Sequence, residues 1–100
     1  MSDTMTLTEP DTSTLAHKAA KLRGEVILMS HRTGAAHLGS SLSCCDVVAA
    51  AYWHALRIDS AKPKDPDRDR FILSKGHAAT ALYGALAMRG FFPEDRLKEY

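Results

Sequence analysis

Apolar residues in the first third of the chain recur with the period of an α-helix. They stand at successive spacings of four, three, four and three, at Leu15, Ala19, Leu22, Val26 and Met29. Because these spacings place side chains along one face of a helix, they predict an amphipathic helix with one buried stripe. Ser13 or Thr14 is suited to cap its start. Gly34 is suited to the left-handed conformation that would end it near residues 30–33.

The segment from Gly34 to Ser43 has no apolar period of its own. It reads GAAHLGSSLS, with two glycines and three serines around His37, and this composition predicts a loop of specified shape. Ser43 is expected to cap a second helix, since Asp46 stands three residues later as in a capping box. The predicted apolar face of that helix consists of Val47, Val48, Ala51, Tyr52 and Leu56.

The second half of the chain joins a charged connection to short apolar segments. Residues 59–69 hold two prolines and seven charged residues, so we expect an exposed connection. The apolar run FIL at 71–73 has the length of a buried strand and is too short for a helix. After a turn, the alanine-rich segment 78–89 predicts a third helix that stops at Gly90. Pro93 is suited to open a further helix.

This order of elements predicts an α/β fold with a single visible strand. One strand cannot form a sheet, so we expect it to pair with strands from a partner or from further sequence. Residues 1–12 contain few apolar side chains without periodicity and are expected to form a flexible lead-in. Residues 13–100 are expected to form one unit.

Composition narrows the classes of function. The chain has 100 residues, 45% hydrophobic and 25% charged, and a formal net charge of +1. So small a charge gives no field that would attract nucleic acid or an anionic membrane. No apolar run approaches the ~18 residues of a membrane span, and the first ten residues lack the features of a secretory signal. We therefore expect a cytoplasmic protein that binds neither nucleic acid nor membrane.

Two histidines are the strongest candidates for chemistry. His77 follows the predicted strand and Gly76 at a helix start, where backbone amides favour an anion and an imidazole can donate a hydrogen bond to phosphate. The alternative is that His77 caps the helix or packs in the core. His37 lies among small residues that let a ligand approach, and could move a proton or bind a hydroxyl. The alternative is an exposed histidine without a task.

Nearby polar residues allow either interpretation. Ser40, Ser41 and Ser43 could bind a ligand, but turns and caps explain such serines equally well. Lys75 could steady an anion or simply be solvated.

A metal site is not predicted from the cysteines and histidines of this region. The candidates are His31, His37, Cys44 and Cys45, and they lack the paired spacing of zinc ligands. The adjacent cysteines enclose no loop that a disulfide could close, which fits a reducing compartment. We interpret them as small apolar residues in a helix.

Two stretches resemble the transketolase family. GAAHLGSSLSCCDVVAAAYWHAL is similar to the family's SGHPG stretch with its following helix, and PDRDRFILSKGHAATALYGALAMRGFFP resembles its DRF(V/I)LSKGHA motif almost letter for letter. Together with the preceding helix they span roughly residues 15–97. The resemblance is nearest to the N-terminal subunit of two-chain transketolases. It implies that residues 13–100 are the first part of a thiamine diphosphate-binding domain, in which helices flank a parallel sheet.

The resemblance also implies roles for matched positions. His77 corresponds to a histidine that contacts the diphosphate of thiamine diphosphate. His37 corresponds to a catalytic histidine that faces the substrate and assists proton transfer at sugar hydroxyls, and Ser40 to a cofactor-binding position. The implied reaction transfers a two-carbon ketol unit from a ketose phosphate to an aldose. The Mg²⁺ ligands, a GDG motif and a downstream Asn, are expected beyond Tyr100.

The implied partners are sugar phosphates and a C-terminal transketolase subunit or domain, in a homodimer or heterotetramer. Without the metal ligands we expect the 100-residue chain to be inactive and poorly folded alone. Ala36 and Leu38 replace the family's usual glycine and proline, which leaves the sugar preference open. Alternative interpretations are an enzyme similar to 1-deoxyxylulose-5-phosphate synthase and a non-catalytic interaction module that retains the fold.

Overall fold

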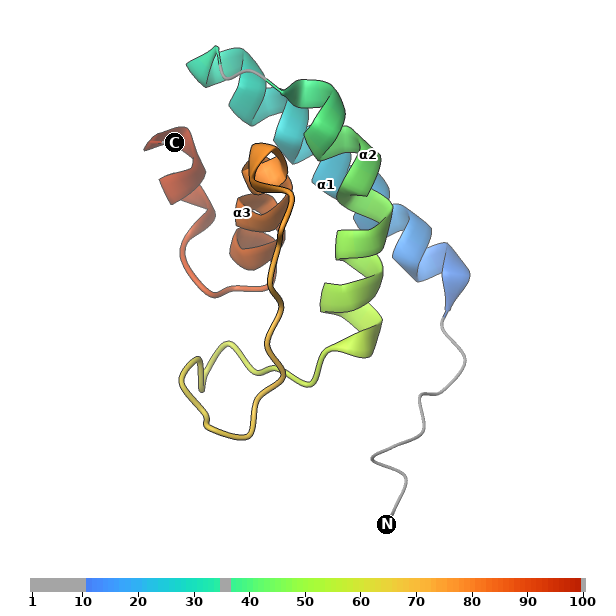
Figure 1. The fold of residues 1–100 in the computed structure, drawn as a ribbon, viewed down its shortest axis with the longest axis vertical. Helices are drawn as coiled ribbons and strands as arrows, with labels where there is room; N and C mark the ends of the chain where they lie inside the picture. The colour runs from blue at the N-terminus through green and yellow to red at the C-terminus, as the bar shows by residue number, and fades with distance from the viewer. Residues whose placement is uncertain (1–10, 35–36, 100) are drawn as a thin grey trace.

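The chain forms a helical assembly built on three packed α-helices (Figure 1). The computed structural model describes residues 11–34 and 37–99. In chain order the elements are α1 (Thr12–Thr33), α2 (Leu38–Ala50), the π-helical turn η2 (Ala51–Ala55), the 3₁₀ turn η3 (Gly76–Ala78), α3 (Ala79–Met88) and the 3₁₀ helix η4 (Glu94–Glu99). Each α-helix contacts the other two. The long connection between η2 and η3 loops out at one end of the molecule (Figure 1).

Helix α1 confirms the predicted amphipathic helix. Its stripe is buried from Ala19 to Met29, while Leu15 at the start is half-buried. Leu22 and Val26 belong to one core cluster with residues of α2 and α3, including Cys45, Val48, Ala81 and Ala85. The apolar periodicity of the sequence therefore identifies the face on which the other helices pack.

The predicted cap of α1 was wrong by two or three residues, and the predicted end of the helix is confirmed. Asp11 is the cap, because its carboxylate accepts hydrogen bonds from the backbone N–H groups of Ser13 and Thr14 at 3.1 and 3.2 Å. The Thr14 hydroxyl also donates to it, and this bond lowers the pKa of Asp11. Gly34 ends the helix with a left-handed φ of 66°. Of the predicted lead-in at residues 1–12, residues 1–10 lie outside the described residues.

Helix α2 begins earlier than the sequence predicted. The expected loop from Gly34 to Ser43 is helical from Leu38 onward, and Ser43 lies inside the helix instead of capping it. The Ser43 hydroxyl donates to the carbonyl oxygen of Ser40 at 3.0 Å. Serine side chains that bond back to the preceding turn fit within a helix as well as at its start. The serines of this segment therefore do not distinguish a capped helix start from a helix interior.

The buried face of α2 also differs from the predicted one. Val47 is 67% exposed, whereas Cys45 and Ala49 are buried together with the predicted Val48 and Tyr52. The spacing of three and four residues runs through Ser41, Cys45 and Val48, because the helix already includes the serine segment. A helix that began at Ser43 would exclude Ser41 and interrupt this periodicity.

The π-helical turn η2 joins α2 to the long connection. The N–H of Leu56 donates to the carbonyl oxygen of Ala51 at 2.8 Å, the five-residue spacing of a π-helix. The Arg89 guanidinium, at the end of α3, donates to the carbonyl oxygen of Tyr52 within this turn. A cation from a neighbouring element thus satisfies a carbonyl group in the irregular turn.

The charged connection is exposed, as predicted, and it is closed by Arg57 and Asp69. The Arg57 N–H donates to the Asp69 carboxylate at 2.7 Å, and the Asp69 N–H donates to the Arg57 carbonyl oxygen at 3.1 Å. The bond from the Arg57 backbone is the main cause that lowers the pKa of Asp69. This pair fixes the path by which the chain returns toward α3.

The predicted strand at 71–73 is not formed, and the described residues contain no strand at all. Residues 71–73 run as irregular chain toward η3, with Ile72 85% exposed. The Phe71 ring contacts Tyr52 edge-on, with ring centroids 5.4 Å apart. A strand requires hydrogen bonds to a neighbouring strand, and residues 11–34 and 37–99 supply none. The sheet of the predicted α/β fold is therefore not shown.

Helix α3 confirms the third predicted helix within a residue or so. Its start is tightened into the 3₁₀ turn η3, and Gly90 follows its end with a left-handed φ of 85°. Gly84 lies where α3 crosses α1, and a Cβ added there would stand 2.8 Å from the Leu22 side chain. The segment after Pro93 is helical, but as 3₁₀ helix η4. No helix in the described part of the chain is long and apolar enough to cross a membrane.

Candidate functional site

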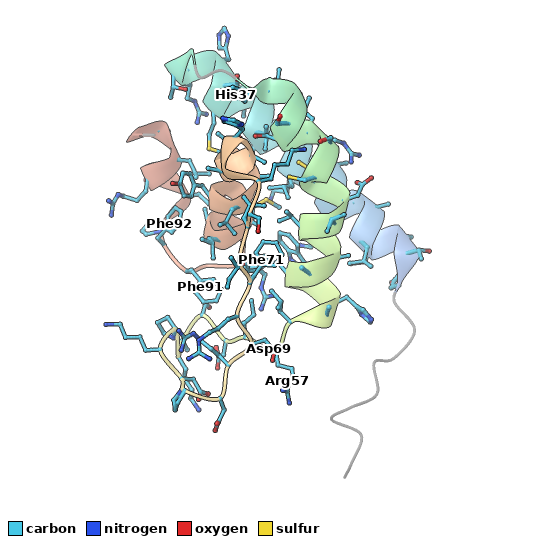
Figure 2. All side chains as sticks on the ribbon, in the orientation of Figure 1. His37, Arg57, Asp69, Phe71, Phe91 and Phe92 are labelled. Atoms are coloured by element: carbon cyan, nitrogen blue, oxygen red, sulfur yellow. The ribbon has the colours of Figure 1, made fainter. Side chains whose placement is uncertain are left out.

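The starts of α2 and α3 bring His37 and His77 face to face. The two imidazole rings stack with centroids 4.2 Å apart and an interplanar angle of 25°, and both side chains are exposed. Figure 2 shows His37 beside the start of α3, at the opposite end of the molecule from Arg57 and Asp69. Two residues predicted separately thus form one exposed pair of hydrogen-bonding groups.

The backbone of His37 is in an unusual conformation. As the residue preceding α2, it has a φ of 67°, a positive value that among the described residues is otherwise found at Gly34 and Gly90. For a side chain other than glycine, this region costs about 1–3 kcal/mol, and such residues cluster at functional sites. The left-handed backbone lets α2 begin directly after His37, next to η3.

A buried hydrogen bond lies one turn below the histidine pair. The Thr80 hydroxyl of α3 donates to the Ser41 hydroxyl of α2 with an oxygen–oxygen distance of 2.5 Å. Ser41 is 1% exposed and Thr80 6% exposed, so water does not compete for the bond. Two hydroxyl groups that would be costly to bury separately satisfy each other between the helices.

A second, exposed hydrogen bond joins α2 to the residue that precedes η3. The Lys75 ammonium group donates to the Ser43 hydroxyl at 2.9 Å. Lys75 lies two residues before His77, so its positive charge is held near the histidine pair. Ser40, the predicted cofactor contact, is half-buried in the first turn of α2 and accepts the Ser43 hydrogen bond through its carbonyl oxygen.

The cysteines lie on the helix below this site. Cys45 is fully buried, and burial raises the pKa of its thiol to about 11. Both thiols are within donor distance of the Ser41 carbonyl oxygen, at 3.4 Å for Cys44 and 3.3 Å for Cys45. Within residues 11–34 and 37–99, no group of three or more histidine, cysteine or acidic side chains could hold a metal ion.

The histidine pair is separate from an apolar cleft elsewhere in the molecule. That cleft, of about 370 Å³, is lined by Tyr52, Phe71 and Phe91 among others, near the charged connection. None of the predicted site residues lines it. The candidate site is therefore an exposed edge, which a further surface would have to cover to enclose a ligand.

Sequence reasoning missed Thr80 and assigned Ser41 only an ambiguous role. The available signal was a threonine inside an alanine-rich helix, where threonine is a weaker helix former than its neighbours. Ser41 gives no comparable signal, because the composition of the segment around it predicts a loop. Ala36, one of the two departures noted in that segment, lies outside the described residues.

Exposed imidazoles and an ammonium group at two adjoining helix starts are typical of a site that binds an anionic ligand. The chain belongs to the transketolase family, as its thiamine diphosphate-binding domain: the family model "Transketolase, thiamine diphosphate binding domain" matches residues 17–100.

Several relatives are similar over most of this chain. A 6-deoxy-6-sulfo-D-fructose transketolase subunit from Clostridium sp. (strain MSTE9) is 45% identical over 83 residues, which are 83% of this chain and 30% of the relative. One subunit of the apulose-4-phosphate transketolase from Phocaeicola vulgatus is 38% identical, over 82% of this chain and 29% of the relative. Human transketolase is 39% identical, over 83% of this chain and 13% of the relative. The chain thus spans less than a third of each.

Proposed function

We propose that this chain provides the diphosphate-facing edge of a thiamine diphosphate-dependent transketolase, which transfers a two-carbon ketol unit from a ketose phosphate to an aldose. The observation that carries the proposal is the exposed stack of His37 on His77 within a domain of this family. Two motifs far apart in the sequence would serve one ligand only if they met in space, and they do.

The groups at this edge suit thiamine diphosphate. Imidazole N–H groups and an ammonium group are donors that a diphosphate can accept, and a helix start adds backbone donors. We assign His77 to the diphosphate, with Lys75 as a nearby positive charge and Ser40 as a further contact. When bound, the cofactor supplies the nucleophilic carbon and the electron sink for ketol transfer.

We assign His37 to the sugar substrate. Its exposed ring lies 4.2 Å from that of His77, so a sugar beside a cofactor on His77 would be within reach of it. An imidazole can both donate and accept a proton near neutral pH, as required at sugar hydroxyls. Leu38 follows His37 at the start of α2 and is 37% exposed, so it borders the same surface.

The proposal extends to the complete protein. Mg²⁺ would neutralise the diphosphate, but the described residues do not fit a metal site, so we assign it no ligand among them. The relatives named as subunits support a second, C-terminal transketolase subunit or domain as partner. A homodimer or heterotetramer, sugar phosphate substrates and a cytoplasmic location complete the proposal.

Loss of the His77 ring should weaken cofactor binding. A hydrogen bond to a charged group contributes about 1.5–3 kcal/mol, so His77→Ala is expected to lower the affinity for thiamine diphosphate by about 10- to 100-fold. Isothermal titration of the full-length subunit with its partner and Mg²⁺ measures this. His17→Ala, at an exposed position of α1, is the control. Unchanged affinity in His77→Ala would contradict the cofactor role, and no binding by the unaltered complex would favour a non-catalytic module.

Loss of the His37 ring should reduce turnover while cofactor affinity is largely retained. Positioned acid–base groups typically contribute about 10²- to 10⁴-fold in rate, and we expect His37→Ala to lower kcat within this range. Steady-state kinetics of the complex with ketose phosphate donors is the measurement. Since His37→Gly relieves the left-handed backbone and also lacks the ring, it should be as slow as His37→Ala. Normal rates in either variant would refute the assignment.

A further inference from the structure

The Ser41–Thr80 hydrogen bond lies at matching distances from the two histidines. Ser41 is four residues after His37, and its N–H donates to the His37 carbonyl oxygen at 3.2 Å. Thr80 is three residues after His77, across the tighter turn η3. At about 1.5 Å per residue in an α-helix and 2.0 Å in a 3₁₀ helix, the rise from each histidine to its hydroxyl residue is roughly 5–6 Å. The bond and the ring stack are therefore two parallel connections between the same helix starts.

Of the contacts between α2 and α3, the Ser41–Thr80 hydrogen bond is the one that depends on the exact register of the two helices. Around it the helices meet through small apolar side chains such as Cys45, Val48 and Ala81, whose non-directional contacts constrain a slide of one helix along the other less than a hydrogen bond does. Two buried hydroxyl groups do not tolerate such a slide, because each would lose its partner away from water. A single buried polar pair can thus specify helix register.

We propose that Ser41 and Thr80 are positioning residues, whose hydrogen bond sets the register of α2 against α3 and thereby holds His37 over His77. Neither hydroxyl reaches the exposed site itself. The positioning rests on the geometry alone, and its effect on catalysis rests on the function proposed above. The exposed Lys75–Ser43 bond joins α2 to the residue before η3, and water can replace it, so it is not expected to set the register.

The test uses the full-length subunit in complex with its partner. Thr80→Val removes the hydroxyl and keeps the shape, Thr80→Ser keeps the hydroxyl, and the double variant Ser41→Ala/Thr80→Val removes both hydroxyls. Thr80→Val alone leaves the buried Ser41 hydroxyl unpaired and should be destabilised, whereas the double variant should regain much of that stability. Ser43→Ala, which removes the exposed bond, is the matched control.

The first measurement is the distance between the His37 and His77 rings in crystal structures of the ligand-free complexes. We expect the stack to be retained in Thr80→Ser and Ser43→Ala, and lost in the double variant. An intact stack in the double variant would overturn the proposal. This measurement needs no cofactor, so it remains decisive even if the proposed function fails.

The second measurement is kcat/KM of the same variants. Displacement of a site group by about 1 Å can cost on the order of 100-fold, so we expect a 10- to 100-fold loss in the double variant and near-normal values in Thr80→Ser and Ser43→Ala. A merely structural role predicts that activity returns together with stability in the double variant, and that result would refute positioning. A wild-type complex that does not bind thiamine diphosphate would instead refute the proposed function.

Discussion

The adjacent residues Cys44 and Cys45 differ in burial, and burial changes the acidity of a thiol. Cys44 and Cys45 both lie on α2. Cys45 belongs to the hydrophobic core between the helices, whereas Cys44 is half-buried at the margin of that core. A thiolate is disfavoured away from water, and burial, with a smaller effect of Cys44, raises the pKa of Cys45 to about 11. Sequence alone indicated small apolar residues in a helix, and could not rank the two because the start of α2 was misplaced.

The stability of the chain should therefore fall at alkaline pH. The Cys45 pKa is raised from 9.0 to about 11 in the folded state, so its contribution is complete below pH 9 and is lost as the pH rises toward 11. Urea unfolding at intervals between pH 8 and 11 should show this decline. Cys45→Ala removes the ionising thiol and should have a shallower pH dependence. Identical slopes in the two proteins would contradict the assignment.

Among the elements, those with a repeated apolar period could be predicted and those that depend on partners could not. The stripe of α1 and the alanine-rich α3 were predictable because each carries its own periodicity. The start of α2 depends on the left-handed backbone of His37, which no pattern of residue types announces. The segment at 71–73 has the composition of a strand, but strand formation depends on neighbours that the described residues do not contain. The two histidines were predicted from their local sequence. The hydrogen bond between Ser41 and Thr80 could not be, because it depends on how α2 and α3 pack against each other.

Two helical glycines should respond oppositely to added side chains. Nothing lies within 4 Å of a Cβ built on Gly24 in α1, so Gly24→Ala is expected to stabilise the chain by about 0.5–1 kcal/mol. Gly84 faces Leu22 at the crossing of α3 with α1, and Gly84→Val should destabilise by about 1–3 kcal/mol through overpacking. Denaturant unfolding measures both. Gly24→Val is the matched control, with a change below about 0.5 kcal/mol, and equal effects of valine at both sites would argue against the close crossing.

At the scale of the whole molecule, the core is small. Of the thirteen buried apolar residues among those described, six are alanines, whereas Ile72 and Val47 are exposed. Alanine buries little area, so each contributes less to stability than a leucine or valine in its place would. These features together indicate a chain whose core is weak for its size.

As a separate polypeptide, the 100-residue chain should have low stability. We expect a free energy of unfolding below the ~5 kcal/mol at the lower end of the usual range for domains, because a chain of this size buries only about 60% of its surface. Urea titration followed by circular dichroism measures it. The same titration of Gly24→Ala should shift the midpoint upward if the native helices are present at the start. A cooperative transition with a free energy well above 5 kcal/mol would disprove the expectation.

The π-helical turn after α2 constrains how this sequence can change in length. A π-helix is an α-helix that has accommodated one additional residue, and one residue corresponds to a rotation of about 100° around the helix axis. Deleting a residue from Ala51–Ala55 would restore the regular helix and turn Arg57 away from Asp69, which closes the long connection. In evolution, a deletion here would need a compensating change in that connection. Descendants of this sequence should therefore vary more readily in the composition of the turn than in its length.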